Sequence, residues 1–310
     1  MKIKQIIKNQ LQETPAAEQQ RNVALVLSGG GARGFAHIGA IRELQQRGYC
    51  ITSIAGTSIG ALVGGFYAAG KLDEFTEWII SLKKKNVFNM MDFSLSMDHM
   101  MKGKRLMGKM KEILVGARIE ALPIPFCAVA TNITTGKEQL FRSGDLATAI
   151  RASISLPGLM RPVIIGEHIF VDGGVINQMP LNRVVRTEGD LLFGIDVSAP
   201  SEHNYDGLKN YNRHYSGGFL GEMRRRAYNI RSKAGQNYVS LGMRVSELAI
   251  QSNAALTKKL NPPNLLLEIP CDRYNTLGFD RAAEIIERGQ QDMAAKLDEF
   301  EKQTRYNKNT

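Results

Sequence analysis

The sequence has few of the features that mark secreted or metal-binding proteins. Its 310 residues include three cysteines, Cys50, Cys127 and Cys271, which are scattered and form no C-x-x-C pair. This spacing argues against a disulfide framework and against a cysteine-based metal site. Cys50 and Cys127 lie in apolar, strand-like runs, so we expect both to be reduced core residues. No metal is expected.

Long hydrophobic runs are also missing. The chain has no stretch of about 18 apolar residues, which argues against a membrane-spanning helix. Residues 1–22 are polar and basic, without the apolar stretch of roughly 7–15 residues that a secretory signal needs. We therefore expect a cytoplasmic protein, and peripheral contact with a membrane stays open.

Acidic residues are outnumbered, and the formal net charge is +10. Residues 83–118 are basic and rich in methionine, which fits either a helix with its methionines turned inward or a lipid-facing surface. Residues 204–233 combine basic residues with tyrosines, and we interpret them as a cap over the site. Such a composition also occurs in nucleic-acid-binding segments, but no recognised motif accompanies it, so no nucleic-acid partner is expected.

Apolar runs alternate with helical patterns along the chain, which predicts an α/β fold with a central, mostly parallel sheet. Strands are predicted near residues 23–27, 51–55, 125–130, 138–142, 162–165, 168–171, 191–197 and 264–269. Helices are predicted at residues 35–47, 59–69, 73–82, 104–114, 145–153, 180–186, 241–258 and 280–303.

The most informative motif is Gly-Thr-Ser-Ile-Gly at residues 56–60. It fits G-x-S-x-G, a sharp strand-to-helix turn that exposes a serine hydroxyl. Apolar residues precede it and small residues follow, so Ser58 is predicted at a helix N-terminus, with Gly56 and Gly60 shaping the elbow. The N–H groups and dipole of that helix end favour a negatively charged nucleophile. An ordinary βα turn is the alternative interpretation.

A glycine-rich loop follows the first predicted strand and leads into a helix. This order lets backbone N–H groups converge on an anion, such as the oxyanion of ester hydrolysis. The candidate oxyanion residues are Gly29, Gly30, Gly31, Ala32, Arg33 and Gly34. Arg33 could hold the loop in shape or meet a phosphate head group.

The same glycines also satisfy G-x-G-x-x-G, so a dinucleotide site must be considered. That site needs an acidic residue about 20 positions on, and residues 49–55 contain none. A phosphate-binding P-loop needs Gly-Lys-Ser/Thr, where this chain has Phe35 and Ala36 after the last glycine. No cofactor is expected.

A third candidate is Asp172, which follows an apolar strand-like stretch and precedes Gly173 and Gly174. A carboxylate at a strand end can reach into a site, although an aspartate in a β-turn is common. Serine hydrolases usually use a histidine base. None of the five histidines, His37, His99, His168, His203 and His214, lies in a catalytic motif. Asp172 is then left as a direct base, which requires it to be desolvated and in contact with the serine.

Four blocks in this order resemble the patatin-like phospholipases, and the variant is most similar to bacterial proteins related to neuropathy target esterase. They are residues 29–34, 56–60, 151–158 (Arg-Ala-Ser-Ile-Ser-Leu-Pro-Gly) and 172–174. The resemblance implies a three-layer α/β/α sandwich and a Ser-Asp dyad, with Ser58 as nucleophile, Asp172 as base and residues 29–34 as oxyanion hole. It covers about residues 21–200, so we expect a polar tail at 1–20, a catalytic domain at 21–200 and a C-terminal extension at 201–310.

The expected function is a serine esterase that cleaves phospholipids, lysophospholipids or other fatty esters. One alternative is an α/β-hydrolase with His203 or His214 as base, although too few elements precede the elbow for that fold. The other alternative is a lipid-binding protein without turnover. The sequence does not determine the acyl length, the head group or the oligomeric state.

Overall fold

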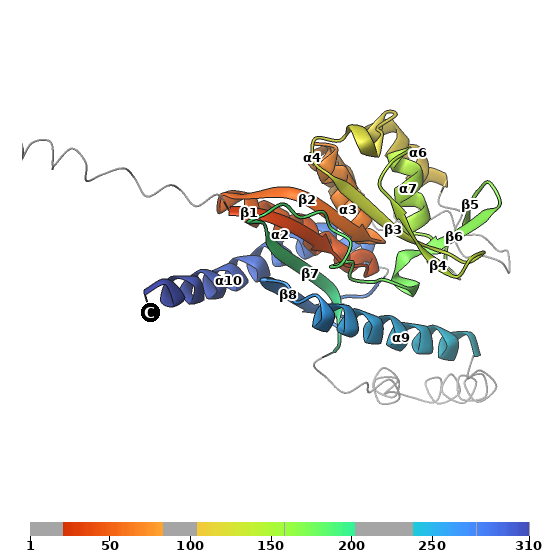
Figure 1. The fold of residues 1–310 in the computed structure, drawn as a ribbon. Helices are drawn as coiled ribbons and strands as arrows, with labels where there is room; N and C mark the ends of the chain where they lie inside the picture. The colour runs from red at the N-terminus through yellow and green to blue at the C-terminus, as the bar shows by residue number, and fades with distance from the viewer. Residues whose placement is uncertain (1–20, 83–103, 158, 202–237, 277, 310) are drawn as a thin grey trace, which may run out of the picture.

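The computed structural model describes residues 21–82, 104–157, 159–201, 238–276 and 278–309. These residues form an eight-stranded sheet covered by helices (Figure 1). The strand order is β5-β6-β3-β2-β1-β7-β8, and β4 pairs with β3 beside this path. Strands β3, β2, β1, β7 and β8 are parallel, whereas β4, β5 and β6 add antiparallel pairings at one side.

Each predicted strand is present, with its ends shifted by a few residues at most. The strands are β1 Arg21–Leu27, β2 Tyr49–Thr57, β3 Phe126–Asn132, β4 Lys137–Phe141, β5 Val163–Ile165, β6 His168–Asp172, β7 Leu191–Ala199 and β8 Leu265–Pro270. Cys50 corrects one expectation: it is exposed near the start of β2, because its neighbours Tyr49 and Ile51 take the buried positions there. Cys127 is buried in β3 as predicted.

Seven of the eight predicted helices are present. The α-helices are α2 Ala36–Gln46, α3 Ile59–Ala68, α4 Leu72–Ser81, α6 Lys104–Leu114, α7 Leu146–Ser153, α9 Tyr238–Leu260 and α10 Ala282–Asn309. Short 3-10 turns are η1 Gly31–Phe35, η2 Ile119–Ala121, η3 Gly173–Val175 and η4 Phe279–Arg281.

The helix predicted at 180–186 is wrong. Its residues form a single turn, closed by a bond from the Arg183 N–H to the Pro180 carbonyl at 3.0 Å. Arg183 then pairs with Glu138 of β4, and the β-branched residues Val184 and Val185 do not favour continuing the helix. Side-chain contacts with the sheet therefore override a weak helical pattern.

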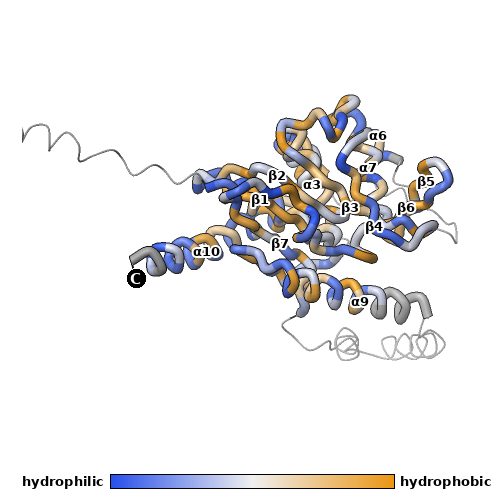
Figure 2. The backbone as a smooth tube through the Cα atoms, in the orientation of Figure 1, coloured by the Kyte–Doolittle hydropathy of each residue, from blue (hydrophilic) through white to orange (hydrophobic). Residues whose placement is uncertain are grey.

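The core lies on both faces of the sheet, and strand alternation sorts the residues between them. Val23, Leu25 and Leu27 of β1 join the main cluster with α2, α3, α7 and α10, whereas Val26 joins a smaller cluster with Ala254 of α9. Hydrophobic colouring is accordingly concentrated in the central strands and α3 (Figure 2). The chain is thus an α/β sandwich, and in its described part the second outer layer consists of α9 and the irregular segment before β7.

Both basic stretches fall largely outside the described residues, at 83–103 and 202–237. The described end of the first stretch is α6, whose Met110 is fully buried and whose Met107 packs against the main core. For this helix the inward-facing interpretation of the methionines holds. No helix in the described ranges combines the length and the apolar character needed to cross a bilayer.

Candidate active site

Ser58 lies in the sharp turn between β2 and α3. It is one of two described non-glycine residues with positive φ, at 54°, a conformation that costs on the order of 1–3 kcal/mol. The turn is closed by its glycines: a Cβ on Gly56 would lie 2.5 Å from the Gly60 carbonyl, and one on Gly60 would lie 2.2 Å from the Leu27 carbonyl. Packing therefore enforces the strained backbone, and it leaves Ser58 partly exposed at the N-cap of α3.

Asp172 lies at the same level of the sheet as Ser58. Strands β2 and β6 follow one another along the edge of β3 that β4 leaves free: Val129 pairs with Thr57, and the next residue, Ala130, pairs with Asp172. A Cβ on Gly173 would lie 3.1 Å from the Thr57 side chain, so the ends of β2 and β6 meet, and the Ser58 and Asp172 side chains can contact each other at the carboxyl edge of the parallel strands. The structure thus brings together the predicted nucleophile and the predicted base.

The Asp172 carboxyl group is buried, with 3% of the residue exposed. Its Oδ1 accepts a hydrogen bond from the Gly174 N–H at 2.8 Å. Its Oδ2 has no partner with ordinary hydrogen-bond geometry among the described residues, yet the Ser58 hydroxyl is near enough to lower the pKa of the carboxyl. The pair is in contact without being locked, which is common for catalytic groups before substrate binds.

Burial dominates the electrostatics of this carboxyl group. Desolvation raises the pKa of Asp172 to about 6, and the Ser58 hydroxyl and the Gly174 N–H oppose that rise. No cation contributes to the shift. A carboxylate with a raised pKa and no neutralising partner is a stronger base than an ordinary aspartate.

The glycine-rich loop packs directly against the elbow, since a Cβ on Gly34 would lie 2.2 Å from the Ile59 side chain. Two of its N–H groups are already used: Gly29 donates to the Gln178 carbonyl at 3.3 Å, and Ala32 donates to the Thr276 carbonyl at 2.8 Å. The N–H groups of Gly30 and Gly31 have no acceptor within the part of the chain that the structure describes. These two are the loop's available donors for an oxyanion.

The segment after β8 holds the other side of this loop. Gly31 has φ +61°, and a Cβ there would lie 2.5 Å from the Thr276 carbonyl, so both its conformation and its surroundings require glycine. Arg33 is buried and donates to the carbonyls of Val197 and Cys271 at 2.9 and 2.8 Å, and to Thr276 Oγ1 at 3.0 Å. The guanidinium group therefore ties the loop to the sheet.

Gln178 links the loop with the Asp-Gly-Gly turn, a role that the sequence analysis missed. Its amide fills the space beside Gly29 and Gly174, where a Cβ would lie 2.5 and 2.4 Å from Gln178 Oε1. Its Nε2 donates to Ser198 Oγ at 2.9 Å. The buried amide thereby spaces the oxyanion loop from the turn that carries Asp172.

The sequence analysis also missed Ser153 and Ser155, at the end of α7. Ser153 Oγ accepts the Ser58 N–H at 2.9 Å and donates to the Val129 carbonyl at 2.5 Å. Two residues on, the Ser155 carbonyl accepts the Asp172 N–H at 2.9 Å. One short segment thus fixes the backbones of the predicted nucleophile and the predicted base. The only sequence signal was their place in the block at 151–158.

Neither histidine in the described residues approaches this role. His37 is fully buried, its Nε2 lies 3.0 Å from the Ser28 carbonyl, and burial lowers its pKa to about 4. His168 is exposed near the tip of a hairpin, with its ring packed beside Phe170. His99, His203 and His214 lie outside the described residues. No group of three His, Cys, Asp or Glu side chains in the described ranges has the arrangement of a metal site.

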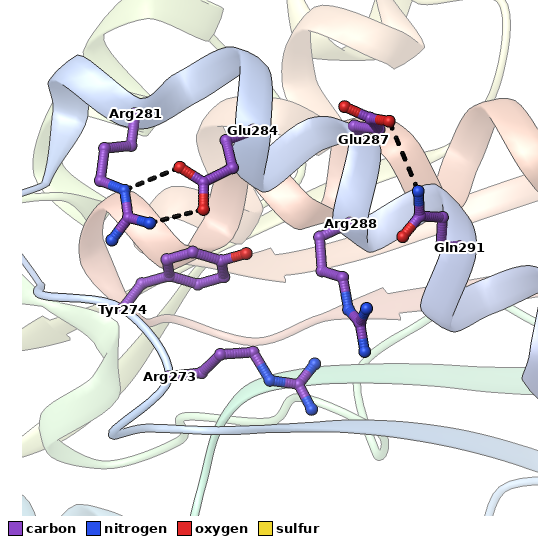
Figure 3. A pocket seen from close by; sticks show the side chains of 7 residues that line it. All are labelled: Arg273, Tyr274, Arg281, Glu284, Glu287, Arg288 and Gln291. Atoms are coloured by element: carbon purple, nitrogen blue, oxygen red, sulfur yellow. Dashed lines mark hydrogen bonds and ion pairs between the residues drawn. The ribbon is translucent and has the colours of Figure 1, made fainter.

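A separate hollow of about 570 Å³ lies between the segment after β8 and α10 (Figure 3). Neither Ser58 nor Asp172 lines it. Its three arginines are paired: Arg281 binds Glu284 at 2.8 Å, whereas Arg273 and Arg288 both bind Asp292, at 2.5 and 3.0 Å. This hollow is therefore distinct from the candidate active site.

The sequence profile of patatin-like phospholipases matches residues 25–185, which include the elbow, the glycine loop and Asp172. The chain belongs to the patatin-like phospholipase family. Membership agrees with the observed α/β sandwich.

Relatives come from bacteria and animals. An uncharacterised NTE family protein of Mycobacterium tuberculosis is 41% identical over 176 residues, 57% of this chain and 49% of its own length. Mouse patatin-like phospholipase domain-containing protein 7 is 31% identical over 285 residues, 87% of this chain and 20% of its own length. The crystal structure of VipD from Legionella pneumophila aligns with a TM-score of 0.44 and 15% identity, over 92% of this chain and 68% of that one. This chain spans about half or less of the two sequence relatives.

Proposed function

We propose that this protein is a serine esterase that cleaves the acyl esters of phospholipids, lysophospholipids or other fatty esters with a Ser58–Asp172 dyad. One observation carries the proposal. A serine held at φ 54° on a helix N-terminus lies beside a buried carboxyl group that no cation of the described residues neutralises. A structural aspartate with that degree of burial normally has a paired charge.

In the proposed reaction, Asp172 takes the hydroxyl proton while Ser58 Oγ attacks the ester carbonyl carbon. The tetrahedral intermediate collapses, its C–O bond to the alcohol breaks, and Asp172 returns the proton to the departing alcohol. Water then attacks the acyl-serine ester with Asp172 again as base, which releases the fatty acid and the free serine. The dyad needs no cofactor.

We expect the Asp172 carboxylate to act as a base without a histidine, because burial raises its pKa. A solvated aspartate, with a pKa near ~3.9, holds a proton too weakly to help at neutral pH. A pKa of about 6 approaches the value of an unperturbed imidazole. Burial therefore gives Asp172 the basicity that a histidine supplies in a triad.

The oxyanion would bind to the N–H groups of Gly30 and Gly31. Donors held in place before the reaction stabilise the developing charge without reorganising, typically by about 3–4 kcal/mol per donor. The contacts of Arg33 and Thr276 keep this loop in place. We therefore assign Arg33 to the shape of the loop, and its replacement should reduce turnover of charged and uncharged esters alike.

We also propose the cytoplasm as its location, because the three cysteines are unpaired, as in a reducing compartment.

The test is covalent labelling by a fluorophosphonate, which traps an activated serine. Wild-type protein should be labelled at Ser58, and Ser58→Ala should not react. Ser155→Ala serves as the matched control, because it removes a buried serine hydroxyl near the site, one that bonds Arg151, and keeps the nucleophile. Labelling of Ser58→Ala at wild-type stoichiometry refutes the assignment. A panel of p-nitrophenyl esters and phospholipids would then identify the preferred substrate.

A further inference from the structure

A row of three isoleucines crosses the antiparallel side of the sheet. Ile164 of β5 pairs with Ile169 of β6, and the Ile133 N–H, just after β3, bonds the Ile169 carbonyl at 2.9 Å. Cross-strand neighbours share a face, so the three side chains lie together. Phe170 and Val163, the alternate residues of β6 and β5, pack on the opposite face towards α7. We call Ile133, Ile169 and Ile164 the isoleucine row.

The isoleucine row is open to solvent at both ends. Ile164 is 71% exposed and Ile133 is 50% exposed, whereas Ile169 between them is partly buried. Single exposed aliphatic residues are common on protein surfaces and need no partner. A row of neighbouring exposed aliphatic side chains on one face of a sheet indicates a contact surface instead.

The row projects from the sheet edge that carries the candidate active site. Strand β6 runs inward from His168 to Asp172, which is about 13 Å at roughly 3.3 Å per residue. Strand β3 extends past Val129, the partner of Thr57, to reach Ile133. The turns after β3 and β5 therefore extend beyond Ser58. Val175, three residues after Asp172, adds another aliphatic side chain, 40% exposed.

We propose that the isoleucine row docks on an anionic lipid surface and brings Ser58 to its substrate; this inference rests on the proposed function. Lys137, in the hairpin that Ile133 opens, and Arg161, three residues before Ile164, are exposed cations, and the whole chain carries a net charge of +10. Aliphatic side chains flanked by cations suit insertion among acidic lipid head groups. Glu167 is the exposed acid at the same hairpin.

A second copy of the chain is the competing occupant, because β5 is an edge strand. Its pairing edge is weak, however. Strand β5 has only three residues, with Pro162 before it and Gly166 after it, and short edges with proline resist strand addition. A bilayer contact needs no backbone pairing, and it uses the exposed side chains directly.

The test is sedimentation of the full-length protein with vesicles of phosphatidylcholine alone or with added phosphatidylglycerol. The wild type should bind the anionic vesicles more strongly, and Ile133→Ser/Ile164→Ser should lower that binding about tenfold or more. The control is Leu260→Ser, which removes a 77% exposed leucine at the opposite edge of the sheet, and it should bind like the wild type. Turnover of a water-soluble p-nitrophenyl ester should stay within about twofold for all variants.

Three results overturn the inference: no vesicle binding by the wild type, unchanged binding by the double variant, or an equal loss in Leu260→Ser. Self-association that the double variant abolishes in sedimentation velocity would assign the row to a second copy instead. If the double variant misfolds, Ile164→Ser alone gives the same comparison. Vesicle binding without ester turnover would refute the proposed function and leave the docking surface standing. Ester turnover without vesicle binding would refute the docking surface and leave the proposed function standing.

Discussion

Asp172 and Asp196 are both buried aspartates near the end of a strand, and each accepts the N–H of the residue two positions on. Asp172 Oδ1 binds the Gly174 N–H at 2.8 Å, and Asp196 Oδ1 binds the Ser198 N–H at 3.0 Å. Their second oxygens differ. Asp196 Oδ2 meets the Lys258 ammonium group at 2.9 Å, whereas Asp172 Oδ2 has no hydrogen-bond partner among the described residues.

The comparison separates a carboxylate paired with a cation from the proposed base. A buried charge paired with a cation is satisfied and contributes to the fold, whereas one that lacks a cation raises the free energy of the folded state. That cost appears at Asp172 as a raised pKa, and it is tolerated where basicity is useful. Both aspartates accept the same kind of backbone hydrogen bond. The two carboxyl groups therefore differ mainly in the cation, which Asp196 has in Lys258 and which Asp172 lacks among the described residues.

The largest expected effect is on activity. Asp172→Asn keeps the shape of the side chain and removes the base, so kcat/KM for an ester should fall by about 10²–10⁴-fold. Asp196→Asn should retain activity within roughly tenfold, because it removes a charge that the proposed reaction does not use. Replacing each histidine in turn should also leave substantial activity. A folded histidine variant as inactive as Asp172→Asn would refute the dyad.

The oxyanion loop should give the next effect. In Gly30→Val the new side chain would meet Val197 Cγ2 at 2.6 Å, which displaces the loop donors. Loss of one donor typically lowers kcat by about 10²–10³-fold, with a smaller change in KM. Gly108→Val is the matched control, because a Cβ at that helical position meets nothing within 4 Å. A kcat that falls equally in both variants would count against the loop assignment.

Stability should change in opposite directions in the two aspartate variants. The pKa of Asp172 rises from 3.8 to about 6 on folding, so its contribution to stability is lost as pH rises through that range. At pH 7 the deprotonated carboxylate therefore costs on the order of 3 kcal/mol, and Asp172→Asn should raise the free energy of unfolding by up to about that amount. Asp196→Asn should lower it by about 1–3 kcal/mol, because Lys258 loses its buried partner and keeps its ion pair with the more exposed Glu268. Denaturant unfolding at pH 7 and pH 4 measures both, and the gain in Asp172→Asn should vanish at pH 4.

Most of the fold, and the two turns that carry the proposed dyad, could be predicted from the sequence, because both rest on local signals. Apolar alternation located every strand, and the glycines around Ser58 and Asp172 marked turns where a Cβ cannot fit. The supporting contacts could not be predicted. Ser153 and Gln178 act through residues 95 and 149 positions away, Ser58 and Gly29, so their roles depend on how α7 and the Asp-Gly-Gly turn pack. The failed helix at 180–186 has the same cause, since contacts with β4 decided its structure.

The pH dependence should follow the Asp172 carboxyl group. As a base it must be deprotonated, so kcat/KM should rise about tenfold per pH unit up to a midpoint near 6 and then level off. His37 does not titrate in this range, since its pKa is lowered to about 4. An imidazole pKa falls markedly on heating and a carboxyl pKa barely moves. Profiles at two temperatures should therefore give the same midpoint, and a midpoint that falls with temperature would indicate a histidine base.

The smallest expected effect concerns the support of the nucleophile rather than the base. Ser153→Ala leaves the Ser58 N–H and the Val129 carbonyl without their shared hydroxyl, so the strained turn loses its anchor beneath the nucleophile. We expect kcat and the rate of fluorophosphonate labelling to fall about tenfold, with KM nearly unchanged, because positioning acts on the transition state.

Ser155→Ala is the matched control for that experiment. It also removes a fully buried serine hydroxyl on the same segment, but within the described ranges that hydroxyl bonds Arg151 alone. The Asp172 N–H is held by the Ser155 backbone carbonyl, which the substitution keeps. Equal thermal destabilisation with a loss of kcat confined to Ser153→Ala would identify Ser153 as a positioning residue. Equal losses of kcat in both variants would show that Ser153 contributes through packing alone. The difference between Asp172 and Asp196 would then be explained by the cation that pairs with Asp196, without any contribution from the support of Ser58.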